Sequence, residues 1–303
     1  MSHAVVEIDS LTKDFKGVKA VDDLSFRVEP GQVCGLLGPN GAGKTTTLRM
    51  LVGLIRPTSG SAKLFGETVH AGSPELLRVG ALVEQAAFSP NLSGMTNLKL
   101  WWQAGGGKLS DADVDGALAV AGLGDAVNRK VKTYSQGMKQ RLGFARLLLA
   151  RPEFLILDEP TNGLDPGEIK EIRDLVRRLA EAGSSVLLSS HHLTEVEQTC
   201  SHVVVMNRGR LVTAGTVDAI IGASGVVLIE VDDAPRAEIV LNALPTVSKT
   251  TVDGNTLQVS MQGGRRSDLV KVLVDAGLRV ETIGASQSLE DAFLGLLDEG
   301  TNR

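Results

Sequence analysis

The chain contains the stretch Gly38-Pro39-Asn40-Gly41-Ala42-Gly43-Lys44-Thr45-Thr46, and this stretch decides its fold. It matches the phosphate-loop pattern G-x-x-x-x-G-K-[ST] without a mismatch. The apolar run at 32–37 predicts a buried strand before it, and residues 46–52 predict a helix after it. Because the pattern is complete and lies between a strand and a helix, it favours a nucleotide site over a glycine turn that only packs a helix on a sheet.

The chemistry of this loop follows from its backbone. Gly41 and Gly43 can adopt dihedral angles that other residues avoid, so successive N–H groups can point inward. These amides and the positive end of the following helix would hold a polyphosphate. Lys44 would contact the β- and γ-phosphates, and the Thr45 hydroxyl would bind Mg²⁺. We expect nucleotide contacts from the whole loop, Gly38, Pro39, Asn40, Gly41, Ala42, Gly43, Lys44, Thr45 and Thr46.

Length and composition limit the class of protein. The 303 residues are 43% hydrophobic and 22% charged, as in a globular protein of one large or two ordinary domains. The net charge of −5 offers no basic field, so we expect no nucleic-acid partner. We see no apolar run long enough to span a bilayer and no signal peptide, and we expect a cytoplasmic location. The two cysteines suggest a reducing compartment, with Cys34 as a small buried hydrophobe.

A second acidic motif follows another predicted strand. Four apolar residues at 154–157 predict a central parallel strand, and Asp158 and Glu159 follow at its carboxyl end, where open α/β sheets bind ligands. Asp158 would hold Mg²⁺, largely through water, and Glu159 would be the general base for an attacking water. Two acids in a solvated turn are common, but this context favours the functional interpretation.

Three further residues are candidates for the same site. Gln85 follows the apolar run at 81–83, at the exit of a predicted strand, and its side-chain carbonyl could contact Mg²⁺ or the attacking water there. His191 comes directly after the strand predicted at 185–190, where it could hydrogen-bond a γ-phosphate. Phe15 is either a half-buried loop residue or a platform for an adenine ring.

Residues 88–130 change character and predict a helical insert. Trp101 and Trp102 lie on one of its helices and point about 100° apart. One of them could be exposed on a partner-docking surface; packing of both in the core is an alternative that the sequence favours at least as much. Ser135 precedes a further helix, where it is a good N-cap and where free amides also make an anion site.

Taken together, residues from about 5 to 221 resemble the ATP-binding subunit of an ABC transporter. The resemblance rests on several spaced motifs, which are Walker A at 38–46, the Q-loop residue Gln85, the signature at 134–138, Walker B at 154–159 with Glu159 as its catalytic glutamate, the D-loop at 163–165, the switch histidine His191 and the adenine-stacking aromatic Phe15. The signature departs from Leu-Ser-Gly-Gly-Gln at Gln136 and Met138 but keeps Ser135 and Gly137. Such variants resemble those of single-cassette exporters of antibiotics and other hydrophobic compounds.

The resemblance implies an α/β fold of the P-loop NTPase type for residues 1–222. It has a mixed sheet core, an antiparallel N-terminal β subdomain and a helical insert at about 88–150. It also implies a homodimer in which ATP and Mg²⁺ on Walker A of one protomer are capped by Ser135 and Gly137 of the other, and Asp165 of the D-loop is expected to contact nucleotide as well. A separately encoded membrane permease would hold the protein at the inner face of the cell membrane.

Residues 223–303 carry none of these motifs. Their pattern of strands and helices, β-α-β-β-α-β, predicts a small α+β accessory domain of the ferredoxin-like type. The segment 288–294 resembles the tails of ATPases of the daunorubicin-resistance group. This domain could stabilise a dimer, regulate it or contact the permease, and the sequence does not choose among these roles.

The resulting hypothesis is an ATPase that energises export of a hydrophobic compound or drug. An importer ATPase is one alternative, and a soluble ABC ATPase acting on ribosomes or DNA is another. The soluble class usually carries two cassettes, long coiled coils or basic linkers, and we recognise none of these in the sequence.

Overall fold

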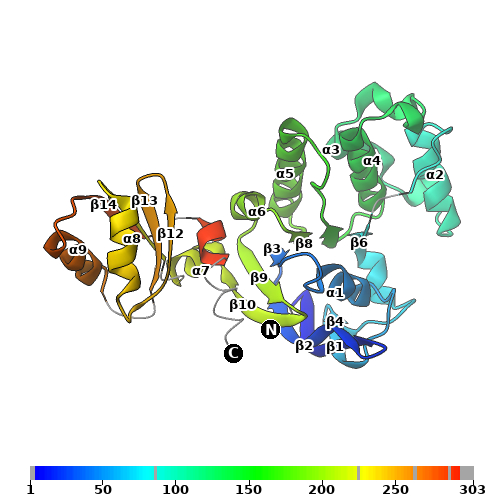
Figure 1. Cartoon of the computed structure of the whole chain (residues 1–303). Coiled ribbons are helices and arrows are strands. Elements are labelled where there is room, and N and C mark those ends of the chain that lie inside the picture. The colour runs from blue at the N-terminus through cyan, green and yellow to red at the C-terminus, as the bar shows by residue number, and fades with distance from the viewer. Residues whose placement is uncertain (1–3, 85–86, 224–225, 262–264, 286–287, 294–303) are drawn as a thin grey trace. The chain divides into compact units, whose positions relative to one another are not determined.

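A computed structural model describes residues 4–84, 87–223, 226–261, 265–285 and 288–293. The chain forms two compact units, Met1–Ala214 and Gly215–Arg303 (Figure 1). The domain boundary expected from the sequence, between 222 and 223, remains a prediction.

The N-terminal part of the first unit is a four-stranded sheet of order β2-β1-β4-β5. Its strands are β1 (Val6–Phe15), β2 (Val18–Val28), β4 (Ser59–Leu64) and β5 (Glu67–Thr68). All three neighbouring pairs are antiparallel. This is the antiparallel subdomain that the resemblance implies.

The second sheet of this unit has the order β10-β9-β3-β8-β7-β6. Its strands are β3 (Val33–Leu37), β6 (Val79–Leu82), β7 (Phe154–Asp158), β8 (Ser185–Ser190), β9 (His202–Asn207) and β10 (Arg210–Thr216). The pairs β6–β7, β7–β8, β8–β3 and β3–β9 are parallel. A two-residue turn, Arg208-Gly209, joins β9 to β10 with φ angles of 48° and 82°, which is hairpin geometry and makes the sheet mixed.

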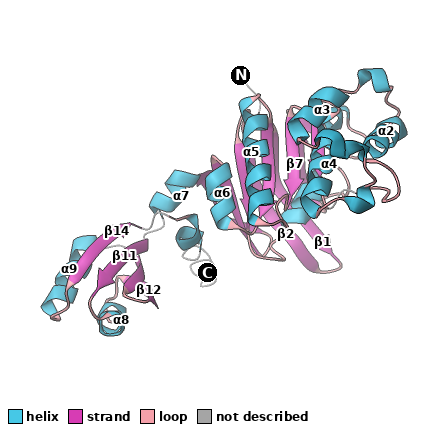
Figure 2. Ribbon diagram, turned by 90° about the horizontal axis from the view of Figure 1, so that it is seen from above, coloured by secondary structure: helices cyan, strands magenta, loops and turns pink. Residues whose placement is uncertain are grey.

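Helices cover both faces of this sheet. The helix α1 (Lys44–Leu51) buries Leu48, Met50 and Leu51 in a core shared with strands of both sheets. The helices α5 (Pro166–Glu181) and α6 (Leu193–Thr199) lie against the sheet, as Figure 2 shows. The buried residues of α5 recur at helical spacing and form one apolar stripe: Ile172, Leu175, Val176 and Leu179. Within the described ranges, no helix combines the length and apolarity needed to cross a bilayer.

The helical insert contains α2 (Gly94–Ala104), α3 (Val114–Ala121) and α4 (Gln136–Leu148). Short 3-10 turns accompany the sheet and the insert at Pro74–Arg78, Leu109–Asp111, Gly124–Asn128 and Val131–Thr133. Each α-helix of the insert begins at a residue whose side chain accepts a backbone N–H, which satisfies a free donor of the first turn: Ser93, Asp113 and Ser135. The predicted capping role of Ser135 is therefore confirmed.

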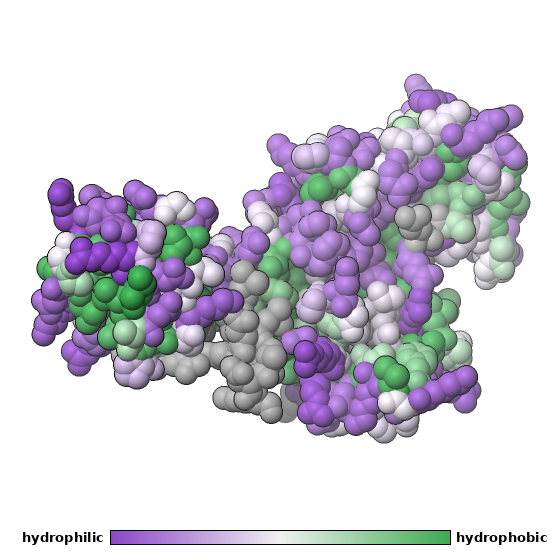
Figure 3. All heavy atoms as spheres, viewed as in Figure 1, coloured by the Kyte–Doolittle hydropathy of each residue, from purple (hydrophilic) through white to green (hydrophobic). Residues whose placement is uncertain are grey.

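The tryptophans of α2 lie on the surface of the insert. Trp101 is 44% exposed, and Trp102 is partly buried and donates from its indole N–H to the Lys108 carbonyl at 2.8 Å. The alternative that both pack in the core is therefore wrong. The guanidinium of Arg146 lies 5.2 Å from the ring centroid of Trp101 and 5.8 Å from that of Phe88. Burial of the Arg146 guanidinium lowers its pKa. Apolar side chains gather on the surface over α2 (Figure 3).

The second unit begins with α7 (Val217–Ala223) and then alternates strands and helices. They are β11 (Val226–Val231), α8 (Ala234–Asn242), β12 (Val247–Asp253), β13 (Thr256–Met261), α9 (Arg266–Asp275) and β14 (Val280–Ala285). The sheet order is β12-β13-β11-β14, with antiparallel neighbours throughout. Both helices bury leucines against this sheet, and residues 289–293 are helical. This is the element order of a split β-α-β unit.

Candidate functional site

The loop between β3 and α1 has the backbone that the glycine pattern predicts. Gly41 has a φ of 81° and Gly43 a φ of 101°, values that other residues rarely adopt. A Cβ on Gly43 would lie 2.3 Å from the backbone oxygen of Ala20. Glycine at 43 is thus required both by its φ and by the close approach of β2.

This loop lines a cavity of about 340 Å³. The size falls in the range of about 300–1,000 Å³ that is usual for small-molecule sites. Its walls come from β2, the loop, the start of α1 and the residue after β7, and they are formed by Ala20, Asn40, Gly41, Ala42, Gly43, Lys44, Thr45, Thr46 and Glu159. The two predicted motifs therefore meet at one cavity, at the carboxyl ends of parallel strands.

Lys44 supplies the positive charge of the cavity. Its side chain is only 6% exposed, and its ammonium group donates to the carbonyl of Gly38 at 2.6 Å and of Pro39 at 3.4 Å. The same group lies 3.6 Å from the Oε1 atom of Glu159. A polyphosphate in the cavity would therefore meet a cation that the loop backbone already holds in place.

Asp158 is fixed by two hydroxyl groups. Thr45 donates to its Oδ1 atom at 3.2 Å, and Ser189 donates to the same atom at 2.6 Å. Ser189 lies opposite Asp158 in the parallel pairing of β7 with β8. The predicted magnesium ligands Thr45 and Asp158 are thus in direct contact.

Glu159 is held in an unusual backbone conformation. Its φ is 47°, and its N–H donates to the Ser189 hydroxyl at 2.9 Å. A residue other than glycine rarely adopts a positive φ unless its surroundings impose it. The Oε2 atom of Glu159 is 2.8 Å from Nδ1 of His191. Of the two histidines, His191 is the one within hydrogen-bond distance of the carboxylate, and the His192 ring lies 4.0 Å from the His191 ring, centroid to centroid.

The family model described as ABC transporter matches residues 21–162 of the chain. The chain is 40% identical to the bacitracin transport ATP-binding protein BcrA of Bacillus licheniformis, over 98% of each chain. The chain belongs to the ABC transporter family. It is also 35% identical to the daunorubicin/doxorubicin resistance ATP-binding protein DrrA of Streptomyces peucetius, over 96% of this chain and 92% of that protein.

A solved structure of the ATP-binding subunit of an ABC transporter is 28% identical to the chain, with a TM-score of 0.63. The match covers 71% of this chain and 91% of that subunit. The cassette fold and the resemblance to the daunorubicin-resistance group predicted from the sequence are therefore confirmed. As an ATP-binding subunit of this family, the chain binds nucleotide and is an ATPase.

The signature and D-loop residues of this ABC subunit lie on other elements. Ser135 is the N-cap of α4, and its hydroxyl accepts from the N–H of Met138 at 3.1 Å. Asp165 is the N-cap of α5 and accepts from the N–H of Glu168 at 2.8 Å. Ser135, Gly137 and Asp165 are not among the residues that line the phosphate cavity. Their predicted contacts with nucleotide therefore require a nucleotide that is bound outside this cavity of the same chain.

The structure does not place two other predicted site residues, Phe15 and Gln85, at the phosphate cavity. Phe15 ends β1, is 48% exposed and has the Lys13 ammonium 5.0 Å from its ring centroid. It does not line the cavity, although Ala20 of the paired strand β2 does. Gln85 lies outside the described residues, so its expected contact with Mg²⁺ or water remains a prediction.

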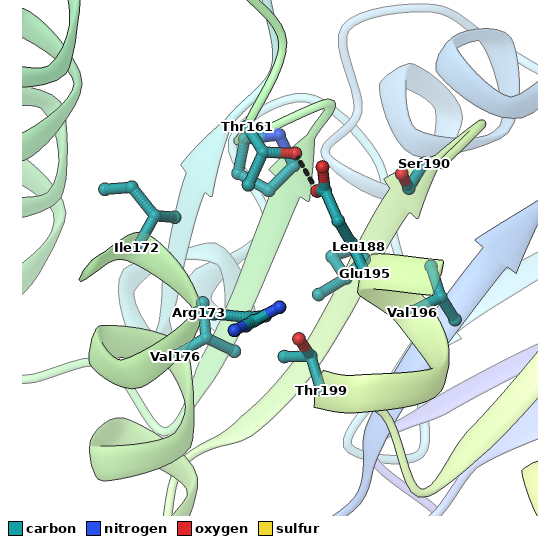
Figure 4. Close-up of a pocket in the computed structure, with 10 residues that line it drawn as sticks. Thr161, Ile172, Arg173, Val176, Leu188, Ser190, Glu195, Val196 and Thr199 are labelled. Carbon is teal, nitrogen blue, oxygen red and sulfur yellow. Dashed lines mark hydrogen bonds between the residues drawn. The ribbon is translucent and has the colours of Figure 1, made fainter. Parts of the chain in front are cut away.

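A hydrogen bond that the sequence did not suggest joins the loop after β7 to α6, the helix that follows β8. Thr161, two residues after Glu159, donates to the carboxylate of Glu195 on α6 (Figure 4). Arg173 and Thr199 point into the small space beside this contact, which measures about 20 Å³. Such a space holds about one water molecule. The loop after Glu159 is therefore tied to the helix that follows His191.

Ser189 hydrogen-bonds both acids of the site but was not predicted from the sequence, in which it is one of three serines of the same strand. It lies in a strand whose six residues are all buried, and its side chain is 0% exposed. A buried hydroxyl needs a hydrogen-bond partner. Its position opposite Asp158 supplies that partner.

Proposed function

We propose that this chain is the ATP-hydrolysing subunit of an exporter and energises the export of a hydrophobic compound or drug through a separately encoded permease. The observation that carries the catalytic part is the position of the Glu159 carboxylate between the Lys44 ammonium and the His191 ring. The similarity to bacitracin and daunorubicin-resistance ATP-binding proteins, which extends over nearly the whole chain, supports the export part.

The residues of the cavity suit ATP together with Mg²⁺. Mg²⁺ is usually held by one or two carboxylates, waters and the substrate phosphates. The Thr45 hydroxyl and the Asp158 carboxylate, 3.2 Å apart, are such a donor set. We expect Gln85 to add a further oxygen. When bound, Mg²⁺ would neutralise charge on the phosphates. Ser189 keeps the Asp158 carboxylate turned toward Thr45.

Hydrolysis requires a base that removes a proton from the attacking water. Glu159 is placed for this role, because it lines the cavity and its Oε2 atom is held by His191. The ring of His191 orients the carboxylate, and we expect it to donate to the γ-phosphate when ATP is bound. Phe15 would stack on the adenine ring from the end of β1.

Ser135, Gly137 and Asp165 would act on nucleotide held by a second copy of the chain. Their place outside the phosphate cavity supports a head-to-tail homodimer with two shared sites. The permease would hold this dimer at the inner face of the membrane, with the helical insert transmitting the motion that follows hydrolysis.

The test of catalysis is Glu159→Gln, which keeps the shape of the side chain and removes its basicity. We expect ATP hydrolysis to fall by about 10²–10⁴-fold, with ATP binding retained. Glu181→Gln, at the far end of α5, is the matched control and should hydrolyse ATP at the normal rate. Normal turnover by the Glu159→Gln protein would refute the assignment.

The test of export is drug susceptibility of cells that express the chain with the permease encoded next to it. We expect resistance to a hydrophobic antibiotic in these cells and loss of that resistance with Glu159→Gln. An adjacent gene for a solute-binding protein, together with uptake instead of resistance, would favour the importer.

A further inference from the structure

The single hydroxyl proton of Ser135 is already engaged within its own protomer. It accepts from the N–H of Met138 at 3.1 Å and donates to the Oε1 atom of Glu168 at 3.0 Å. A serine hydroxyl has a single proton to donate. While Glu168 accepts that proton, Ser135 cannot donate it to a phosphate.

The same carboxylate also covers Gly137. A Cβ on residue 137 would lie 2.3 Å from the Oε1 atom of Glu168. Gly137 is a buried residue in the first turn of α4 and does not have a positive φ, so its backbone angle does not demand glycine. The absent side chain instead leaves the space that the Glu168 carboxylate occupies.

The backbone of Glu168 is held in place from the other side. Its N–H donates to Asp165, the N-cap of α5, and it lies in the first turn of that helix. A carboxylate in the first turn is stabilised by the helix dipole whether or not it contacts Ser135. Rotation of the Glu168 side chain can therefore free Ser135 while the carboxylate keeps part of its stabilisation.

We infer that Glu168 competes with the γ-phosphate of a partner's ATP for Ser135 and so opposes closure of the dimer. The inference rests on the proposed head-to-tail dimer. A carboxylate and a phosphate are both anionic acceptors, and they repel each other at contact distance in a site from which water is excluded. ADP has no γ-phosphate to offer at this position, so Glu168 also favours the open state once hydrolysis has occurred.

The experiment measures the dissociation constant of the ATP-bound dimer in the Glu159→Gln background by sedimentation at saturating Mg-ATP. Adding Glu168→Gln should tighten the dimer by about tenfold per site and by about a hundredfold for two sites, because the neutral amide oxygen of glutamine still accepts from Ser135 but more weakly than a carboxylate does. The affinity of the monomer for ATP should not change. Glu168→Asp keeps the charge at the start of α5 but shortens its reach, and it should tighten the dimer as well.

The controls separate the inference from the proposed function. Glu181→Gln, on the same helix, should leave the dimer constant unchanged. If the Glu159→Gln protein dimerises with ATP but Glu168→Gln does not tighten it, or weakens it, the competition is refuted and the dimer stands. If Glu168→Asp behaves like the parent, the contact with Ser135 is not the cause. If the Glu159→Gln protein forms no ATP-dependent dimer, the proposed sandwich fails, and the inference fails with it.

Discussion

Replacing Ser189 with alanine should destabilise the cassette by about 3 kcal/mol. The side chain is 0% exposed, donates to Asp158 at 2.6 Å and accepts from the N–H of Glu159 at 2.9 Å. A hydrogen bond to a charged group contributes about 1.5–3 kcal/mol, and a buried donor left without a partner costs about 1–3 kcal/mol. The lower part of the summed range applies, because Asp158 keeps its bond from Thr45.

Ser190→Ala is the matched control for this substitution. Ser190 is the next residue of β8 and is also buried, but its hydroxyl accepts from the backbone N–H of His192 at 2.9 Å, and no hydrogen bond of the described residues joins it to Asp158 or Glu159. Its loss should cost about 1 kcal/mol. For a unit of this size, the two substitutions should lower the melting temperature by about 6–12 °C and about 2–4 °C respectively.

The assay is urea unfolding of the nucleotide-free protein followed by circular dichroism, because bound nucleotide would add its own stabilisation. The reasoning is refuted if Ser189→Ala costs no more than Ser190→Ala, or less than about 1 kcal/mol. We also expect slower ATP hydrolysis with Ser189→Ala, since both acids lose a shared anchor.

Three further predictions concern the loop and its supporting strand. Gly43→Ala should lower the free energy of unfolding by about 2–4 kcal/mol, because the added Cβ would clash with the backbone of β2 and the residue would have a strained positive φ. Gly41→Ala meets open space and should lower it by about 1 kcal/mol, from the positive φ alone. Equal losses in urea unfolding would contradict this. Lys44→Ala should weaken ATP binding at least about 100-fold in calorimetry, and a loss within threefold would contradict the role of its ammonium. Burial raises the pKa of Cys34 to about 12, so iodoacetamide at pH 8 should label it only after unfolding. Because the unfolded thiol ionises above its ordinary pKa of 9.0, stability should fall as the pH rises beyond that value; rapid labelling of the native protein would contradict the burial.

The parts of the site that sequence predicts are those set by local pattern. The glycines of the phosphate loop, the strand at 185–190 and the acids at the end of β7 all follow from neighbours within a few positions. Ser189 could not be assigned in this way. Its partner Asp158 is 31 positions away, and the contact depends on the register of two parallel strands.

The contact between Ser135 and Glu168 was out of reach for the same reason. It joins two helices across 33 positions, and the capping pattern around Ser135 says nothing about what accepts its proton. The orientation of Trp101 and Trp102 also needed the structure, since adjacent positions on a helix give a relative angle and not the direction of the core. Tertiary packing, not local preference, decides each of these three cases.

The guanidinium of Arg146 beside the Trp101 ring gives the protein an optical reporter of its own. Trp101 and Trp102 are its two tryptophans, and both lie on α2. All indole emission therefore originates in the helical insert, and a cation 5.2 Å from one ring makes that emission sensitive to any shift of α4 against α2. Stopped-flow fluorescence of the unlabelled protein can thus test whether α2 and α4 shift after ATP is added, without a dye and without a permease.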